Sequence, residues 1–212
     1  MSPFTAHTLR LVTLHMSSSS WQYKLFDDGE CLEYVSRHFS QYFDVYVTLH
    51  KPVERSDFFR YLWLLGDGGM WADIDTEALS PLDQLLHCND TLVVGIERDH
   101  ITEKIAKKFG FGRRPVQLCQ WAMAAAPGHA ALQHLVDTIA SHVRTGKVFS
   151  NNSDLNVILK TGPAPWTDAV LLEAAAGRAR IVPEAVFAGR SPAPPGAVCI
   201  HHFKGTWRQE LV

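Results

Sequence analysis

The stretch GDGGMWADIDTE, residues 66–77, sets two aspartates, Asp73 and Asp75, two positions apart behind a pair of glycines. The pattern over residues 70–75 alternates as in a β-strand, so that Trp71, Asp73 and Asp75 share one face and three apolar side chains share the other. On such a strand the Cα atoms of the two aspartates lie about 7 Å apart. Two carboxylates on one face of a buried strand need a compensating positive charge, because like charges at that separation repel each other.

A divalent cation held between the two aspartates would supply that charge. Without one, repulsion would tend to keep one carboxyl protonated. Ligation by oxygen atoms favours Mn²⁺ or Mg²⁺ over zinc or copper, and such a cation can also offset the charge of a departing diphosphate. The triplet alone is a weak signal, since a pair of aspartates also caps turns. The sequence around it has to decide between these two interpretations.

The composition is that of an ordinary globular protein. It argues against a nucleic-acid-binding protein, a membrane-spanning protein and a cysteine-based metal or redox protein. The 212 residues suffice for one good-sized core, and 46% of them are hydrophobic and 20% charged. A net charge of -2 offers no basic field for nucleic acid. No stretch approaches the roughly 20 apolar residues that span a bilayer. Four scattered cysteines without a C-x-x-C pair indicate neither a zinc site nor a redox dithiol.

Helical and strand-like patterns alternate along the chain, which predicts the α/β class. We expect helices at residues 27–39, 52–65, 129–146 and 165–177. We expect strands at residues 9–16, 44–49, 70–75, 91–97, 179–187 and 197–203, while residues 116–125 are expected to begin as strand and run into helix. This alternation indicates a mostly parallel central sheet flanked by helices, with ligands beyond the carboxyl ends of the strands.

The expected helix at residues 52–65 carries Asp57 and Arg60 three residues apart, so that both side chains point to one side. Pro52 suits its first turn and Gly66 suits its end. A carboxylate and a guanidinium at this spacing can accept from and donate to adjacent hydroxyls of a hexose. The alternative is a surface ion pair, which stabilises a helix by about 0.2–0.5 kcal/mol.

Residues 55–77 resemble a family of glycosyltransferases with a D-x-D motif, glycosyltransferase family 32-like, which includes the fungal initiation-specific α-1,6-mannosyltransferase and inositol-phosphoceramide mannosyltransferases. The family pattern is an aspartate, Arg-Tyr, Gly-Gly, an aromatic residue and D-x-D. Its matches here are Asp57, Arg60, Tyr61, Gly68, Gly69, Trp71, Asp73 and Asp75. Four further blocks are similar to family segments, at residues 21–28, 117–129, 161–170 and 201–207. The resemblance covers most of the chain from Trp21 onward.

The resemblance implies one catalytic domain over residues 1–212 with the GT-A-type fold of nucleotide-diphospho-sugar transferases, and residues 1–20 as a degenerate or truncated first strand. It implies metal-dependent transfer of a hexose with retention at the anomeric carbon. The expected donor is GDP-mannose, the expected acceptor is a glycan or glycolipid, and the expected cofactor is Mn²⁺ or Mg²⁺. Two alternatives stay open: a UDP-hexose-dependent transferase that moves glucose or galactose, and a sugar-binding module without turnover.

The resemblance also assigns roles to individual side chains. The candidate catalytic residues are Asp57, Arg60, Asp73 and Asp75. The candidate substrate-binding residues are Asp57, Arg60, Tyr61, Trp71, Asp73 and Trp207. The candidate metal ligands are Asp73, Asp75, His201 and His202, and alternation along a strand lets only one of the two histidines face the site.

Other segments receive less definite assignments. Gln117 and Trp121 are interpreted as structural or as facing the acceptor. The basic residues 107–114 are expected to close over the diphosphate or to meet an anionic acceptor. Family members act in the Golgi lumen, yet the sequence carries no signal peptide or anchor motif, so a cytoplasmic location stays open.

Overall fold

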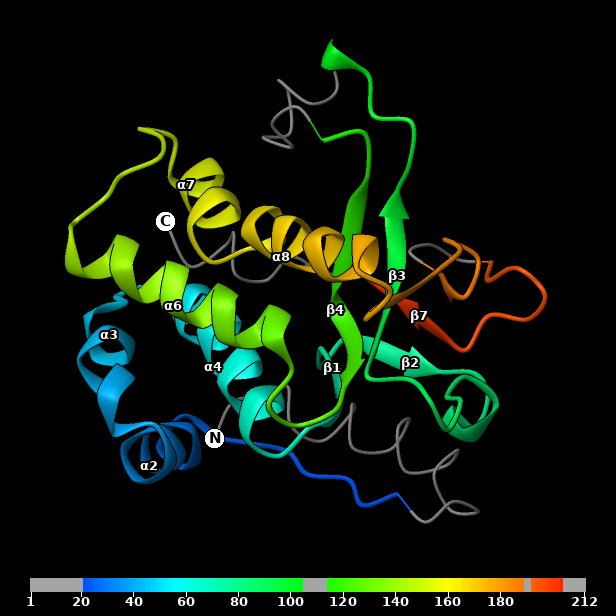
Figure 1. Ribbon diagram of the computed structural model, residues 1–212, viewed down its shortest axis with the longest axis horizontal. Coiled ribbons are helices and arrows are strands. Elements are labelled where there is room, and N and C mark those ends of the chain that lie inside the picture. The colour runs from blue at the N-terminus through cyan, green and yellow to red at the C-terminus, as the bar shows by residue number, and fades with distance from the viewer. Residues whose placement is uncertain (1–20, 105–113, 189–191, 204–212) are drawn as a thin grey trace.

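The computed structural model describes residues 21–104, 114–188 and 192–203 (Figure 1). Within these ranges the α-helices are α2 (Asp28–His38), α3 (Phe43–Thr48), α4 (Pro52–Gly66), α6 (Ala130–Arg144), α7 (Ser153–Lys160) and α8 (Pro163–Ala175). Two short 3₁₀ turns, η1 and η2, span Ser40–Tyr42 and Leu82–Gln84. The predicted strand at residues 9–16 lies outside the described residues. None of the helices in the described ranges is long and apolar enough to cross a membrane.

The strands form two sheets, and the mixed α/β class is confirmed. The first sheet has the order β1 (Gly69–Ala72), β4 (Gln117–Ala125), β3 (Leu92–Arg98) and β5 (Arg180–Val182). The second has the order β2 (Thr76–Ala78), β7 (Cys199–His201) and β6 (Phe187–Ala188). β4 pairs antiparallel with both β1 and β3, whereas β3 pairs parallel with β5.

The prediction of a mostly parallel central sheet is therefore wrong. Two of the three pairings among the described strands of that sheet are antiparallel. The reason lies in β3 and β4, which are consecutive strands and neighbours in the sheet. Consecutive neighbours run antiparallel unless a crossover returns the chain to the edge from which it started. Alternation of helices and strands along a sequence does not reveal where such crossovers occur.

Helices cover one face of the four-stranded sheet, and the second sheet lies on the other (Figure 1). The larger core fills the helical side, with Phe58, Leu62, Leu132 and Trp166 among its fully buried side chains. A smaller core lies between the sheets. Its members include Cys119, Trp121, Phe187 and Cys199. Because β4 contributes to both cores, all nine of its residues are buried.

Two segments were predicted in the wrong state. Residues 44–49 were expected as a strand but form α3, in which Val45 and Tyr46 pack into the larger core. Their β-branched and aromatic composition favours a strand only weakly, and tertiary packing overrides it. Residues 116–125 were expected to turn helical but stay extended as β4. Alanine-rich sequence at Ala122 and Ala124 fits a strand that is covered on both faces.

The glycines after α4 set the path into β1. Gly68 has φ +68° and Gly69 has φ +96°, a left-handed backbone region that L side chains rarely adopt. A Cβ atom on Gly68 would lie 2.6 Å from Pro127 Cδ and 2.9 Å from the Ala125 carbonyl oxygen. The chain therefore leaves the helix against the end of β4, which fixes where β1 and the aspartates after it begin.

This close approach predicts a large cost for a small change. Gly68→Ala combines left-handed strain with overlap against backbone, so we expect it to lower the free energy of unfolding by about 3 kcal/mol. Gly128→Ala is the matched control, because Gly128 has φ +72° but a Cβ atom added there would have nothing within 4 Å; it should cost about 1–2 kcal/mol. Equal losses in urea unfolding would contradict the packing argument.

Candidate active site

The two aspartates lie in the turn that carries the chain from the first sheet to the second. The expected strand at residues 70–75 ends at Ala72, so this prediction is corrected. Asp73 donates its backbone N–H to the carbonyl of Trp121 at 2.8 Å, and Thr76 donates its N–H to the carbonyl of Asp73 at 2.9 Å. Ile74, which strand alternation would have buried, is 46% exposed. The turn forms because β1 pairs with β4 while β2 pairs with β7, so the chain must change sheets between them.

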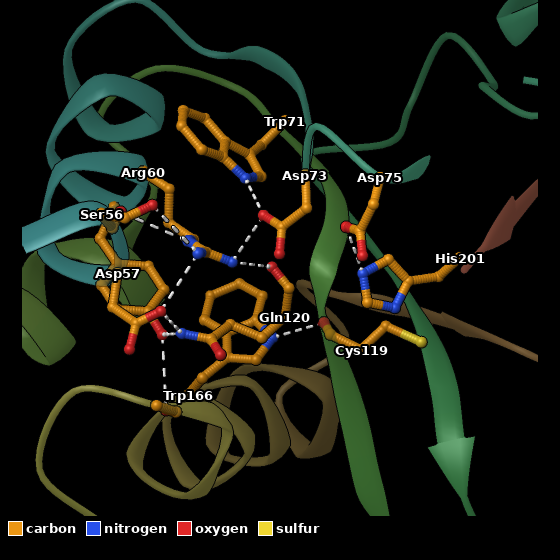
Figure 2. Close-up of polar contacts among 12 residues, drawn as sticks. Ser56, Asp57, Arg60, Trp71, Asp73, Asp75, Cys119, Gln120, Trp166 and His201 are labelled. Atoms are coloured by element: carbon orange, nitrogen blue, oxygen red, sulfur yellow. Dashed lines mark hydrogen bonds and ion pairs between the residues drawn. The ribbon is translucent and has the colours of Figure 1, made fainter. Parts of the chain in front are cut away.

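His201 completes a three-residue cluster with the aspartates. It is opposite Thr76 in the antiparallel pairing of β2 with β7, and its Nε2 lies 2.8 Å from Asp75 Oδ1. One ligand atom from each of Asp73, Asp75 and His201 can be chosen so that all lie within 4.8 Å of one another. Figure 2 shows the side chains of Asp75 and His201 turned toward each other beside Asp73.

The neighbouring histidine faces elsewhere. His202 Nε2 lies 3.0 Å from Glu77 Oε2, and both side chains are about one-third exposed. Its backbone N–H donates to the carbonyl of Asp75 at 3.0 Å, which ties the end of β7 to the turn. Only His201 of the two therefore joins the aspartate cluster, as alternation along a strand requires.

The donor set of this cluster fits a divalent cation. Two carboxylates and one imidazole suit a first-row divalent ion such as Mn²⁺, whereas Mg²⁺ prefers oxygen ligands alone. The Nδ1 atom of His201 is buried and has no hydrogen-bond partner among the described residues. The imidazole contacts Asp75 through Nε2 and packs against the rings of Trp121 and Phe203, and it also interacts electrostatically with Glu97.

Arg60 connects helix α4 to the aspartate turn. It is only 5% exposed, and its guanidinium contacts Asp57 Oδ1 at 3.1 Å and Asp73 Oδ1 at 2.9 Å. It also donates to the Gln120 carbonyl at 3.1 Å. Trp71 Nε1 donates to the same Asp73 Oδ1 at 2.9 Å, and the guanidinium lies 5.4 Å from the Trp71 ring centre (Figure 2). Asp73 is thus held through one oxygen by two donors.

Asp57 is buried beneath this arginine. Its Oδ1 accepts from Gln120 Nε2 and its Oδ2 from the Thr161 hydroxyl, both at 2.9 Å. Burial raises the pKa of Asp57 to about 7, although Arg60, Thr161 and Gln120 each act to lower it. Tyr61 closes the network, because its hydroxyl donates to the Thr161 carbonyl at 2.9 Å and accepts from Gln120 at 2.6 Å.

The structure thus brings most of the predicted residues together. The residues that meet in or beside this network are Asp57, Arg60, Tyr61, Trp71, Asp73, Asp75 and His201. His202 does not join them. Trp207 and most of the basic segment at residues 107–114 lie outside the described residues, and Arg114 at its end pairs with Asp168.

Two contributors were missed by the sequence interpretation. Gln120 lies at the centre of the Asp57 network, and the available signal was a polar residue inside a strand that is otherwise largely apolar. Glu97, near the end of β3, has its pKa raised to about 7 by burial, with His201 acting to lower it. The sequence pattern indicated Glu97 only as the last residue of a strand.

Comparison with known proteins finds similar sequences along most of the chain. Residues 8–92 match the family model described as a glycosyltransferase sugar-binding region containing a DXD motif. The initiation-specific alpha-1,6-mannosyltransferase of Schizosaccharomyces pombe is 30% identical over 248 aligned residues, which cover 98% of this chain and 62% of that protein. Residues 8–92 therefore correspond to the DXD-containing sugar-binding region of this glycosyltransferase family. The initiation-specific alpha-1,6-mannosyltransferase of Candida albicans is 32% identical over 162 residues, which cover 68% of this chain and 41% of that protein.

The chain therefore spans about two-fifths to three-fifths of the length of these two mannosyltransferases. Among solved structures, the PaToxG glycosyltransferase superposes with a TM-score of 0.47 and 19% sequence identity. That superposition covers 70% of this chain and 53% of the other.

The raised pKa of Asp57 predicts a pH dependence of stability. Between about pH 4 and pH 7 the folded protein holds a proton that the unfolded chain releases, so this contribution to the free energy of unfolding falls as pH rises. We expect wild type to lose stability relative to Asp57→Asn from pH 5 to pH 7, by at most about 1.4 kcal/mol per pH unit, in urea unfolding.

The exposed Asp44 provides the control for this experiment. Its pKa is lowered by the hydrogen bond from Arg144, so its titration lies below this window and Asp44→Asn should leave the slope unchanged. If the stability of wild type relative to Asp57→Asn stayed constant or rose between pH 5 and pH 7, the raised pKa of Asp57 would be contradicted.

Proposed function

We propose that this chain is a metal-dependent, retaining glycosyltransferase that moves a hexose, mannose from GDP-mannose in the first instance, onto a glycan or glycolipid acceptor. The proposal includes a single catalytic domain with the GT-A-type fold. One observation carries it above all. Asp73, Asp75 and His201 converge within 4.8 Å directly beside the buried pair of Asp57 and Arg60, in a chain whose residues 8–92 match the DXD family model.

The three converging side chains would hold the cation. Asp75 and His201 present atoms already 2.8 Å apart, and Asp73 adds a carboxylate. Arg60 and Trp71 both donate to Oδ1 of Asp73, so its Oδ2 is directed by two fixed contacts and stays available for the cation or the donor ribose. When bound, a divalent cation would neutralise the diphosphate leaving group.

The buried pair would hold the transferred sugar in place and order the site around it. Arg60 carries a positive charge where solvent is excluded, so its attraction to a sugar oxygen or phosphate is stronger than at the surface. Asp57 is fixed by Thr161 and Gln120, which restricts it to one orientation. An exposed ion pair, the alternative considered from sequence, would have neither the burial nor these contacts.

The proposed donor and acceptor are based on the names of the similar proteins. Two of them are named as initiation-specific alpha-1,6-mannosyltransferases, which supports mannose and a glycan acceptor for this chain. We extend this to GDP as the nucleotide and to action in the Golgi lumen.

A panel of nucleotide sugars tests the donor and the cation together. With Mn²⁺, wild type should hydrolyse or transfer from GDP-mannose and from no UDP-hexose. Chelator or Asp75→Ala should lower turnover by about a hundredfold or more, since a metal is worth several kcal/mol of charge stabilisation. Glu77→Gln is the control, because it changes the next acidic residue along the chain, outside the three-residue cluster, and should retain activity within about threefold.

Each outcome of that panel separates the hypotheses. Turnover of a UDP-hexose in place of GDP-mannose would show that the proposed donor is wrong and that the chain is still a glycosyltransferase. Equal turnover with chelator or in Asp75→Ala would overturn the metal dependence. Sugar binding without turnover of any donor would favour a binding module.

The two adjacent histidines give a second, paired prediction. His201→Ala removes a candidate ligand, so we expect Mn²⁺ affinity to fall at least about tenfold, by analogy with losses at metal-site partners. His202→Ala breaks only the contact with Glu77 and should change Mn²⁺ affinity less than about threefold. Binding can be followed by the electron paramagnetic resonance signal of free Mn²⁺, and the reverse ranking would show that the site uses the other histidine.

A further inference from the structure

Trp121 contacts both chain segments that make up the candidate cation site. It lies near the middle of β4 and is 4% exposed. Its indole ring stacks on the imidazole of His201, with ring centres 4.7 Å apart and planes only 9° from parallel. Its backbone carbonyl accepts the N–H of Asp73 at 2.8 Å. One residue thus touches the aspartate turn through its main chain and His201 through its side chain.

These two segments come from different sheets and are far apart in sequence. The aspartate turn leaves β1, and His201 ends β7, whereas β4 is paired on both sides and wholly buried. A strand in that position is among the least mobile parts of a fold. Trp121 is therefore suited to hold the two segments in a constant relation.

His201 needs such support because its ring orientation is otherwise weakly determined. The χ2 torsion of histidine is broad, so the backbone alone does not fix the plane in which the ring lies beside Asp75. A ligating histidine is ordinarily oriented by a hydrogen bond from its other nitrogen. In His201 that atom, Nδ1, is buried and has no such partner in the described chain.

Aromatic contacts take the place of the missing hydrogen bond. The Trp121 ring covers one face of the imidazole, and the Phe203 ring packs at 78° to it with ring centres 4.1 Å apart. Tilting the imidazole out of this plane would lose the parallel stack, which aromatic pairs favour in offset form. A half-turn within the plane would keep the stack, so the stack fixes the plane of the ring and the contact with Asp75 Oδ1 selects Nε2. In the stacked orientation Nε2 faces Asp75 Oδ1.

We propose that Trp121 is a positioning residue, which holds the His201 ring in the plane from which Nε2, selected by its contact with Asp75, is presented to a cation shared with Asp73 and Asp75. This inference rests on the proposed metal-dependent function. It replaces the interpretation of Trp121 as an acceptor-facing or purely structural residue. The proposed role depends on the face of the indole ring that stacks on His201. It does not depend on the burial of Trp121 in general.

The test compares three purified variants of the whole chain with wild type. Trp121→Leu removes the stack and keeps an apolar side chain, whereas Trp121→Phe keeps an aromatic ring at the same position. Phe187→Leu is the matched control, because Phe187 packs against Trp121 at 6.2 Å in the same core but has no ring contact with His201. Mn²⁺ affinity is measured by the resonance signal of the free ion, and the midpoint of thermal unfolding is recorded for each variant.

We expect Trp121→Leu to weaken Mn²⁺ binding by about 10–100-fold, as other changes next to metal ligands do. Trp121→Phe should recover most of the affinity. Phe187→Leu should lower the unfolding midpoint and leave affinity within about threefold of wild type. If Trp121→Leu does not fold, Trp121→Met provides the same comparison with a flexible apolar side chain.

The same Trp121 substitution in a protein that lacks the His201 side chain distinguishes a positioning role from general damage to the core. In His201→Ala protein, Trp121→Leu should weaken Mn²⁺ binding no further, because the residue through which it acts is gone. Equal further weakening in that background, or unchanged affinity in Trp121→Leu alone, would overturn the inference while leaving the proposed function intact. Absence of Mn²⁺ binding by wild type would overturn the proposed cation site itself.

Discussion

The pairing of the buried Arg60 guanidinium with two carboxylates is the constraint on which this site depends. A charge that is 5% exposed is tolerated only when its donors are satisfied, and here Asp57, Asp73 and the Gln120 carbonyl share them. Each partner comes from a different element: helix α4, the turn after β1, and strand β4. Arginine suits this task because its planar fork reaches several acceptors at once, which a lysine ammonium cannot do in the same geometry.

A single strand serves both halves of the site. In β4, Gln120 turns toward the helices, where it donates to Asp57 and Tyr61. The next residue, Trp121, turns toward the second sheet and stacks on His201. Because successive side chains of a strand point to opposite faces, two neighbouring residues can organise the Asp57 network and the cluster of Asp73, Asp75 and His201 separately. Strand β4 also separates the two hydrophobic cores, one of which lies on each of its faces.

Features that depend on neighbouring residues could be predicted from the sequence, whereas features that depend on distant contacts could not. Helix α4 and strand β3 were found because their periodicity and ending residues are local. The grouping of Asp57, Arg60 and Asp73 came from a family pattern. The antiparallel direction of β4, the turn at Asp73 and the helix at residues 44–49 were missed, since each depends on which distant strand or core is in contact. Gln120 was missed for the same reason.

The contact between Asp75 and His201 joins residues 126 positions apart. During synthesis the aspartate turn therefore leaves the ribosome long before the strand that supplies its imidazole, at translation rates of about 5–20 residues per second. A cation bound by the finished cluster stabilises only chains in which β7 has docked, by mass action on the native state. Under the proposed function, binding of the ion would therefore report that folding is complete, and partly assembled chains would bind it more weakly.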